Sequence, residues 1–157
     1  MMGVFEVHSV EETWGLARQF AAELKPGDVV CLEGDLGAGK TTFTQGLAAA
    51  LGVEGRVTSP TFCLVQEHHS LVPRDSRAPL VAPTALGGKS TILVHMDLYR
   101  LHDEDDVLAI GWEDYLSEGA ILVVEWPERA GSLIPPTAKH IVFTHLEGEE
   151  NRRLAFL

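Results

Sequence analysis

The sequence contains little cysteine and few basic residues, and each shortage excludes a kind of protein. Its 157 residues include two cysteines, Cys31 and Cys63, which are too few and too far apart for a zinc-binding motif. Lysine and arginine together number 12, against 23 aspartate and glutamate residues, which gives a formal net charge of −11. Because proteins that bind nucleic acid by themselves usually present a basic surface, we expect this chain alone to bind RNA or DNA weakly.

Long hydrophobic runs are also missing. No apolar stretch reaches the length of a membrane span, and residues 1–6 have neither the basic flank nor the apolar segment of a targeting signal. Nothing in the cysteine content indicates an oxidising compartment, so we expect a cytoplasmic protein with no membrane partner. The length, with 45% hydrophobic and 22% charged residues, indicates one globular domain over 1–157.

The strongest positive signal is a glycine-rich loop between a short apolar strand and a helix. The loop consists of Gly34, Asp35, Leu36, Gly37, Ala38, Gly39, Lys40 and Thr41. Small residues let backbone N–H groups converge on phosphate oxygens, and the N-terminus of the following helix adds a favourable dipole. In this pattern Lys40 reaches the β- and γ-phosphates, and the Thr41 hydroxyl ligates Mg²⁺. The loop therefore predicts a site for a magnesium-bound nucleotide.

A magnesium–nucleotide site also needs a carboxylate at the end of a nearby strand, and two are available. Asp97 follows the apolar strand 92–96, and Glu125 follows the strand 121–124. Either could simply cap its strand, but two beside a phosphate loop indicate that at least one binds the metal or positions water. The sequence does not assign the two roles. Thr42 is also open, since its hydroxyl either lies near the γ-phosphate or only belongs to the first helical turn.

The order of the expected elements predicts an α/β fold like the sandwich of P-loop nucleoside triphosphatases, with a central mixed sheet flanked by helices. Strands are expected at 4–8, 29–32, 62–65, 92–96 and 121–124, with a terminal hairpin made by 141–143 and 153–156. Ser9 and Glu12 form a capping box that starts a first helix, and the acidic run 103–106 either opens another helix or is only a solvated face. We assign Trp14 and Cys31 to the core.

Several further segments are less decisive. The segment 70–91 is rich in proline and glycine and has little apolar periodicity, so we expect a flexible insertion between two strands. The hydroxyls of Thr58–Thr61 either sense a γ-phosphate or form a turn before a strand. His68 and His69 are adjacent, do not converge on one metal, and are expected at the surface. Trp126 belongs either to the core or to the site.

Four blocks of sequence follow one another in an order specific to one family. They are Gly34–Phe43, Ser59–Phe62, His95–Leu101 and Val124–Glu128. In these blocks, and over most of its length, the chain resembles the bacterial TsaE ATPases, formerly called YjeE. The resemblance implies an ATPase that supports formation of N6-threonylcarbamoyladenosine at position 37 of tRNAs reading codons that begin with A. It also implies TsaD-like and TsaB-like partners, which transfer the threonylcarbamoyl group and contact the tRNA.

The same resemblance implies cofactors and roles for single residues. The cofactors would be ATP and Mg²⁺; Thr41 and Glu125 would ligate the metal, and the catalytic residues would be Lys40, Thr42, Asp97 and Glu125. The residues expected at the nucleotide are Thr13, Asp35, Leu36, Gly37, Ala38, Gly39, Lys40, Thr41, Thr42 and Arg152. The long segment 70–91 departs from the shorter connection of the family, which leaves the local partner surface open.

Two other functions are compatible with a phosphate loop. A small-molecule kinase would need an acceptor pocket and usually an arginine-rich lid, for which Arg74 and Arg77 are the candidates. A non-catalytic switch would bind ATP and report it to a partner. A guanine-specific GTPase is disfavoured, because the sequence has no Asn-Lys-x-Asp element.

Overall fold

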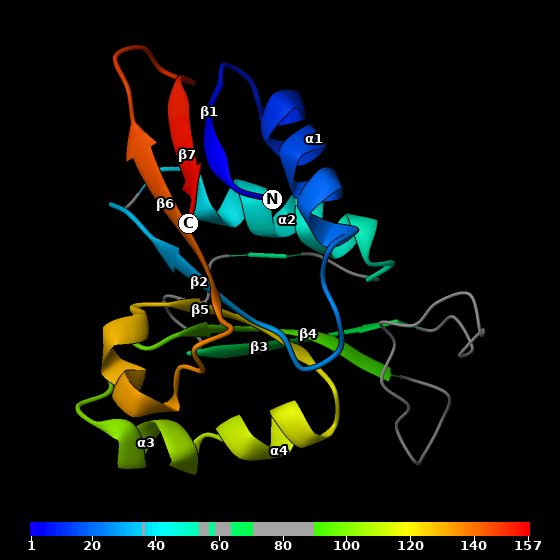
Figure 1. Cartoon of the computed structure of the whole chain (residues 1–157), viewed down its shortest axis with the longest axis vertical. Helices are drawn as coiled ribbons and strands as arrows, with labels where there is room; N and C mark the ends of the chain where they lie inside the picture. Colours follow the sequence, from blue (N-terminus) through cyan, green and yellow to red (C-terminus); the bar gives the residue numbers. More distant parts are fainter. Residues whose placement is uncertain (36, 54–56, 59–63, 71–89) are drawn as a thin grey trace.

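The computed structural model describes residues 1–35, 37–53, 57–58, 64–70 and 90–157. Within these residues the strands form one seven-stranded sheet in the order β1-β7-β6-β2-β5-β4-β3 (Figure 1). The strands are β1 Gly3–Val7, β2 Val29–Glu33, β3 Val65–Ser70, β4 Ser90–Asp97, β5 Ile121–Glu125, β6 Lys139–His145 and β7 Arg152–Phe156. The predicted terminal hairpin is confirmed, because β6 and β7 pair antiparallel.

Helices cover both faces of the sheet, as the sequence predicts. They are α1 Val10–Ala21, α2 Lys40–Ala50, α3 Glu104–Ala109, α4 Trp112–Ser117 and the 3₁₀ segment η1 Pro127–Leu133. α1 and α2 lie on one face, and α3 and α4 lie on the other (Figure 1). The predicted helix starts are confirmed: the Ser9 hydroxyl accepts from Glu12 N, and the Asp103 carboxylate accepts from Asp106 N.

The centre of the sheet is parallel and its edges are antiparallel. β2 pairs in parallel with both β5 and β6, and β5 pairs in parallel with β4. Because helices cover both faces, the residues of β2 and β5 are apolar almost throughout, as is typical of buried parallel strands. The parallel pairing also places the carboxyl-terminal ends of β2, β4 and β5 at the same end of the sheet. The glycine-rich loop, Asp97 and Glu125 therefore all lie at that end.

The boundaries around the third and fourth strands differ from the prediction. Of the expected strand 62–65, only Val65 belongs to β3; Leu64 precedes it with φ 67°, and 62–63 lie outside the described residues. The predicted insertion 70–91 is wrong at its ends, because Ser70 and Ser90–Thr91 continue the antiparallel pairing of β3 with β4. Backbone hydrogen bonding extends this hairpin past the apolar residues from which its length was inferred. Residues 71–89 lie outside the described part of the chain.

The two residues that were assigned to the core, Cys31 and Trp14, have different outcomes: the assignment is confirmed for Cys31 only. Cys31 is fully buried, and burial, with a contribution from Glu33, raises the pKa of its thiol to about 12. Trp14 is 39% exposed, so its assignment to the core is wrong. Its side chain lies against Gly46 of α2, where an added Cβ would come within 2.8 Å of Trp14 Cδ1. Trp14 therefore covers the close contact between α1 and α2 from outside.

The prediction that both adjacent histidines lie at the surface is wrong for His68, which is 6% exposed. The register of β3 against β4 shifts between His68 and His69, and His68 pairs with the fully buried Leu93, so its side chain turns toward the covered face. Burial, together with the nearby His95 and His69, lowers the pKa of His68 to about 4. His68 is therefore neutral in the folded protein at neutral pH.

This buried histidine predicts acid sensitivity. Between an unfolded pKa near 6.5 and the folded value, the unfolded state binds more protons, so the free energy of unfolding falls as the pH drops through that range. We expect His68→Gln to reduce this fall by about 2 kcal/mol, measured by urea unfolding at about pH 7 and pH 4.5. His102→Gln, at an exposed position, is the control. Equal pH dependence in His68→Gln and the wild type would contradict the prediction.

Candidate functional site

The glycine-rich loop connects the end of β2 to the first residue of α2. Gly34 has φ +142°, and a Cβ there would lie 2.5 Å from the backbone oxygen of Phe143, so only glycine fits against β6. Gly39, the N-cap of α2, has φ +105°. Between them Ala38 is buried, and its N–H donates to the Asp35 carbonyl at 3.1 Å. Leu36, which the resemblance places at the nucleotide, lies outside the described residues.

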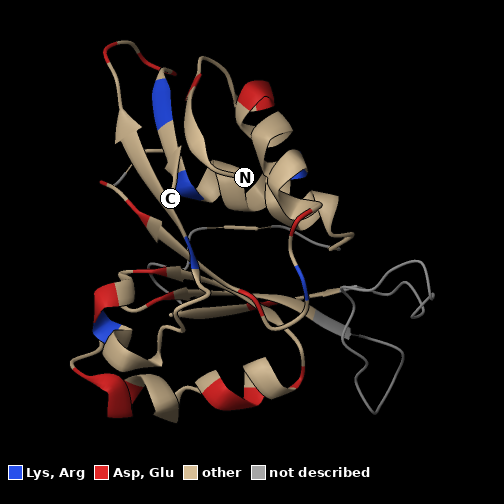
Figure 2. Ribbon diagram, in the orientation of Figure 1, with Lys and Arg blue, Asp and Glu red and all other residues tan. Residues whose placement is uncertain are grey.

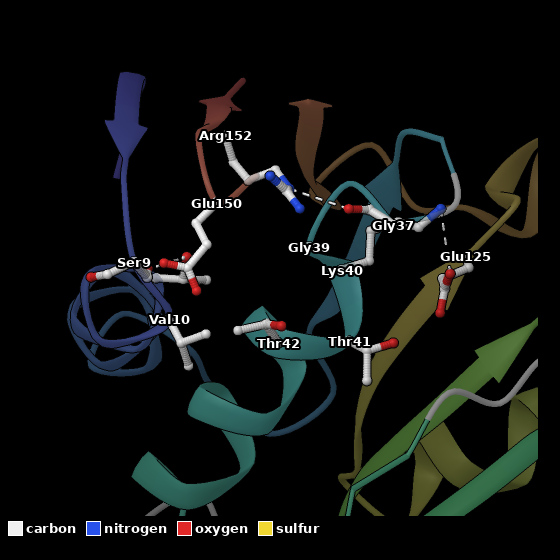
Figure 3. A pocket seen from close by; sticks show the side chains of 11 residues that line it. Ser9, Val10, Gly37, Gly39, Lys40, Thr41, Thr42, Glu125, Glu150 and Arg152 are labelled. Carbon is white, nitrogen blue, oxygen red and sulfur yellow. Dashed lines mark hydrogen bonds and ion pairs between the residues drawn. The ribbon is translucent and has the colours of Figure 1, made fainter. Parts of the chain in front are cut away.

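A cleft of about 240 Å³ opens over the N-terminus of α2 (Figure 3). The N-termini of α1 and α2 and the turn between β6 and β7 meet around this cleft. Its lining residues are Ser9, Val10, Thr13, Gly37, Gly39, Lys40, Thr41, Thr42, Glu125, Glu150 and Arg152. This first cleft thus collects Thr13 and Arg152, which are far from the loop in sequence, beside the hydroxyls of Thr41 and Thr42.

A second cleft of about 770 Å³ adjoins the first along the carboxyl ends of β2, β4 and β5. It is lined by Leu32, Glu33, Gly34, Asp35, Lys40, Asp97, Tyr99, Glu125, Trp126, Pro127 and Glu128. Lys40 and Glu125 line both clefts, so these two side chains lie where the clefts meet. Asp35 and Asp97 line only the second cleft.

The Glu125 carboxylate is held between a lysine and a histidine. Lys40 Nζ lies 3.5 Å from Glu125 Oε1 and donates to the Gly34 carbonyl, while His95 Nε2 lies 2.8 Å from Glu125 Oε2. Burial alone would raise the pKa of Glu125. The hydrogen bond from His95 and the charges of His95 and Lys40 outweigh burial and hold that pKa below its usual range. Glu125 is therefore ionised at neutral pH although it is 6% exposed.

Asp97 lies directly opposite Glu125 in the β4–β5 ladder. Residues paired in this way point to the same face of the sheet, so the two predicted carboxylates are neighbours. Asp97 is 7% exposed, and its Oδ1 accepts from the backbone N–H of Tyr99 at 3.0 Å. One oxygen thus fixes the turn after β4, as a strand-end cap would, while the side chain still faces the second cleft.

The remaining predicted residues surround the first cleft. Thr41 and Thr42 are half-buried in the first turn of α2. The Thr13 hydroxyl donates to the Ser9 carbonyl in its own helix at 3.3 Å. Arg152 Nε donates to the Gly37 carbonyl at 3.2 Å, and its Nη1 donates to the carbonyls of Glu149 and Asn151. Arg152 therefore braces the glycine-rich loop against the terminal hairpin, as the dashed line in Figure 3 shows.

Three residues of the site were not predicted from the sequence: Ser9 and Glu150 line the first cleft, and His95 contacts Glu125. Ser9 was identified only as a helix cap, and Glu150, in the turn before β7, belongs to no local motif that points to the loop. His95 had a signal: it stands two residues before Asp97 on the same strand, so both side chains share a face.

Trp126, left open between core and site, lines the second cleft and is 41% exposed. Its backbone has φ 58° and ψ 54°, a conformation that is uncommon for residues other than glycine. Its ring contacts Tyr99, with 4.8 Å between ring centroids. This aromatic pair forms one wall of the second cleft.

The donor set in the clefts suits a magnesium ion only when phosphate is present. Among the residues that the structure describes, no group of three or more His, Cys, Asp and Glu side chains could hold a metal ion. The Thr41 hydroxyl and the ionised Glu125 carboxylate nevertheless line the same cleft. Mg²⁺ prefers oxygen ligands and is commonly bound by one or two protein groups together with phosphates, so these residues fit Mg²⁺–nucleotide but not a bare ion.

The sheet order, the helices on both faces and the glycine-rich loop between β2 and α2 define an α/β fold of the class seen in P-loop nucleoside triphosphatases. Among the described residues, no helix has the length and apolar character needed to cross a membrane. Within this class the chain belongs to the TsaE family: the family model for "Threonylcarbamoyl adenosine biosynthesis protein TsaE" matches residues 7–154.

Individual relatives agree with the family assignment. The tRNA threonylcarbamoyladenosine biosynthesis protein TsaE of Bacillus subtilis (strain 168) is 38% identical over 146 residues, which cover 93% of this chain and 79% of that protein. The protein of the same name from Aquifex aeolicus (strain VF5) is 42% identical over 125 residues, covering 78% and 75% of the two chains. A crystal structure of Bacillus subtilis YdiB superposes with a TM-score of 0.70 at 30% identity, covering 99% of this chain and 84% of that one.

Proposed function

We propose that this protein is a magnesium-dependent ATPase that acts in the formation of N6-threonylcarbamoyladenosine at position 37 of tRNAs reading codons that begin with A. The observation that carries the proposal is the junction of the two clefts, where Lys40 and the ionised Glu125 meet beside the glycine-rich loop. The relatives named above are tRNA threonylcarbamoyladenosine biosynthesis proteins, and their names support a role for this chain in the same tRNA modification.

The residues of the first cleft would bind the nucleotide. Backbone N–H groups of 37–39 and the N-terminus of α2 would hold the phosphates. Lys40, which donates to the Gly34 carbonyl, would turn its ammonium group to the β- and γ-phosphates. Thr13 and Arg152, which also line this cleft, would lie beside the nucleoside.

Thr41 and Glu125 would hold Mg²⁺, which neutralises charge on the phosphate oxygens when bound. Glu125 suits this role because its carboxylate is ionised and lines the same cleft as Thr41. Asp97, across the ladder from Glu125, would orient the attacking water from the second cleft. Thr42, in the first turn of α2, would support hydrolysis from the first cleft.

A TsaD-like and TsaB-like pair would supply the transfer chemistry and the tRNA contacts. The net charge of −11 opposes approach of this chain to a phosphate backbone. Acidic residues gather on α3 and α4, whereas basic residues are scattered (Figure 2). The protein would therefore act on tRNA through its partners, in the cytoplasm.

A small-molecule kinase is the second candidate, and the second cleft is the observation that favours it. An acceptor molecule bound there would lie beside Lys40 and Glu125. A kinase would transfer the γ-phosphoryl group to that acceptor, whereas an ATPase releases inorganic phosphate. Phosphate release without any added acceptor separates the two.

The proposal is tested by reconstituting tRNA modification over many turnovers with and without this protein. We expect weak ATP hydrolysis by the chain alone, stimulation by the TsaD-like and TsaB-like pair, and repeated rounds of modification only when this protein is present. The isolated chain should be retained poorly with tRNA in filter binding at moderate salt. Tight binding to naked tRNA, or full turnover without this protein, would overturn the corresponding part of the proposal.

A further inference from the structure

His95 is a fully buried histidine at the edge of the sheet where the two clefts meet. Its Nε2 lies 2.8 Å from Glu125 Oε2, closer than Lys40 Nζ lies to Oε1, at 3.5 Å. Because an ionised carboxylate only accepts hydrogen bonds, the proton in this bond belongs to Nε2. His95 therefore donates a hydrogen bond to Glu125, and this contact is shorter than the ion pair of Glu125 with Lys40.

The contacts of the other ring nitrogen, Nδ1, do not explain why a histidine occupies this position. Within the described residues, His95 Nδ1 is a buried atom with no hydrogen-bond partner, and so are Gln66 Oε1 and His68 Nε2. Gln66 lies opposite His95 in the β3–β4 ladder, and His68 follows two residues on, so the three side chains share one face. Unsatisfied buried polar atoms cost stability, and a core position of this size would be filled better by an apolar side chain.

The position of His95 in the sheet gives the ring little freedom. Its neighbours on β4, Val94 and Met96, are fully buried and pack on the opposite face. Two residues further along the strand, Asp97 faces Glu125 across the ladder. β4 therefore contributes both the carboxylate opposite Glu125 and the ring that fixes one oxygen of Glu125.

We infer that His95 is a positioning residue that orients Glu125 toward a bound cation. The inference rests on the proposed function, in which Lys40 turns to the phosphates and no longer faces Glu125. His95 then remains as the side-chain donor to Oε2, which leaves Oε1 free to face the cleft shared with Thr41. Hydrogen bonds to a metal-binding carboxylate of this kind fix its direction, and their loss typically weakens metal affinity about 10–100-fold.

Two amide substitutions separate positioning from packing. The side-chain nitrogen of glutamine in His95→Gln falls near the place of Nε2, whereas that of asparagine in His95→Asn falls near Nδ1 and is too short to reach Glu125. Binding of a non-hydrolysable ATP analogue is measured by calorimetry at increasing Mg²⁺. We expect His95→Asn to need about 10–100-fold more Mg²⁺ for half-maximal effect, and His95→Gln to stay within about threefold of the wild type. Without Mg²⁺, all three proteins should bind the analogue equally.

Equal Mg²⁺ requirements in His95→Asn and the wild type would overturn the inference, and so would a loss in His95→Gln as large as that in His95→Asn. If His95→Asn does not fold, the inference is tested by the Mg²⁺ requirement of His95→Gln and by the ring spectrum of the wild type. Nitrogen-15 spectra of the histidine rings, recorded without nucleotide, should show a proton on His95 Nε2, and its absence would refute the bond. If the wild type binds no nucleotide, the proposed function fails, while the ring spectrum still reports on the contact with Glu125.

Discussion

Replacing Lys40 with alanine should abolish phosphate release and weaken ATP binding, while the protein stays folded. Lys40 lies at the junction of both clefts, and its ammonium group, which donates to the Gly34 carbonyl, is within reach of phosphates seated on the loop. Removing a positively charged donor from a phosphate site typically costs about 100-fold or more in turnover. In the reconstituted modification assay, Lys40→Ala should therefore stall after the first rounds.

The experiment compares three proteins. Phosphate release and calorimetric ATP binding are measured for the wild type, for Lys40→Ala and for Lys25→Ala, which removes an exposed lysine outside both clefts. Thermal melts show that each protein is folded. Absence of ATP binding by the folded wild type would refute the nucleotide site, and normal modification turnover with Lys40→Ala would shift the balance toward a kinase.

The loop and its two flanking elements were predictable because their signal is local. The strand 29–32, the glycines and the helix that begins at Lys40 are contiguous in sequence, and each follows from residue type and spacing. The strand ends at Asp97 and Glu125 were predictable for the same reason. The sequence alone left open how these two carboxylates are placed relative to each other, because that depends on the register of β4 against β5.

Contacts between distant segments set the limit of sequence reasoning. The contact of His95 with Glu125 joins two strands, and the contact of Arg152 with Gly37 joins the terminal hairpin to the loop. Arg152 and Thr13 were named only through the resemblance to a family, and Glu150 was missed, because no local pattern relates them to the loop. The burial of His68 was missed for a related reason, since an edge strand with polar residues does not reveal which of its faces is covered.

Glu125→Gln should impair magnesium-dependent turnover far more than folding. Glutamine keeps the size of the side chain and an oxygen that accepts from His95, but it removes the negative charge that the low pKa of Glu125 maintains at neutral pH. We expect phosphate release per folded molecule to fall about 100-fold or more, because a neutral amide is a poor ligand for Mg²⁺. ATP binding without Mg²⁺ should be retained, since the phosphate contacts come from the loop and Lys40.

The same variant separates an ATPase from a non-catalytic switch. An ATPase requires turnover, so Glu125→Gln should bind ATP and the partner pair yet fail to support repeated rounds of tRNA modification. A switch requires only the bound state, so the variant would support modification as well as the wild type does. Glu113→Gln, which makes the same change at an exposed position of α4, controls for the loss of one negative charge. If the melting temperature of Glu125→Gln collapses while activity per folded molecule stays normal, the buried contacts of Glu125 with Lys40 and His95 serve the fold and not the reaction.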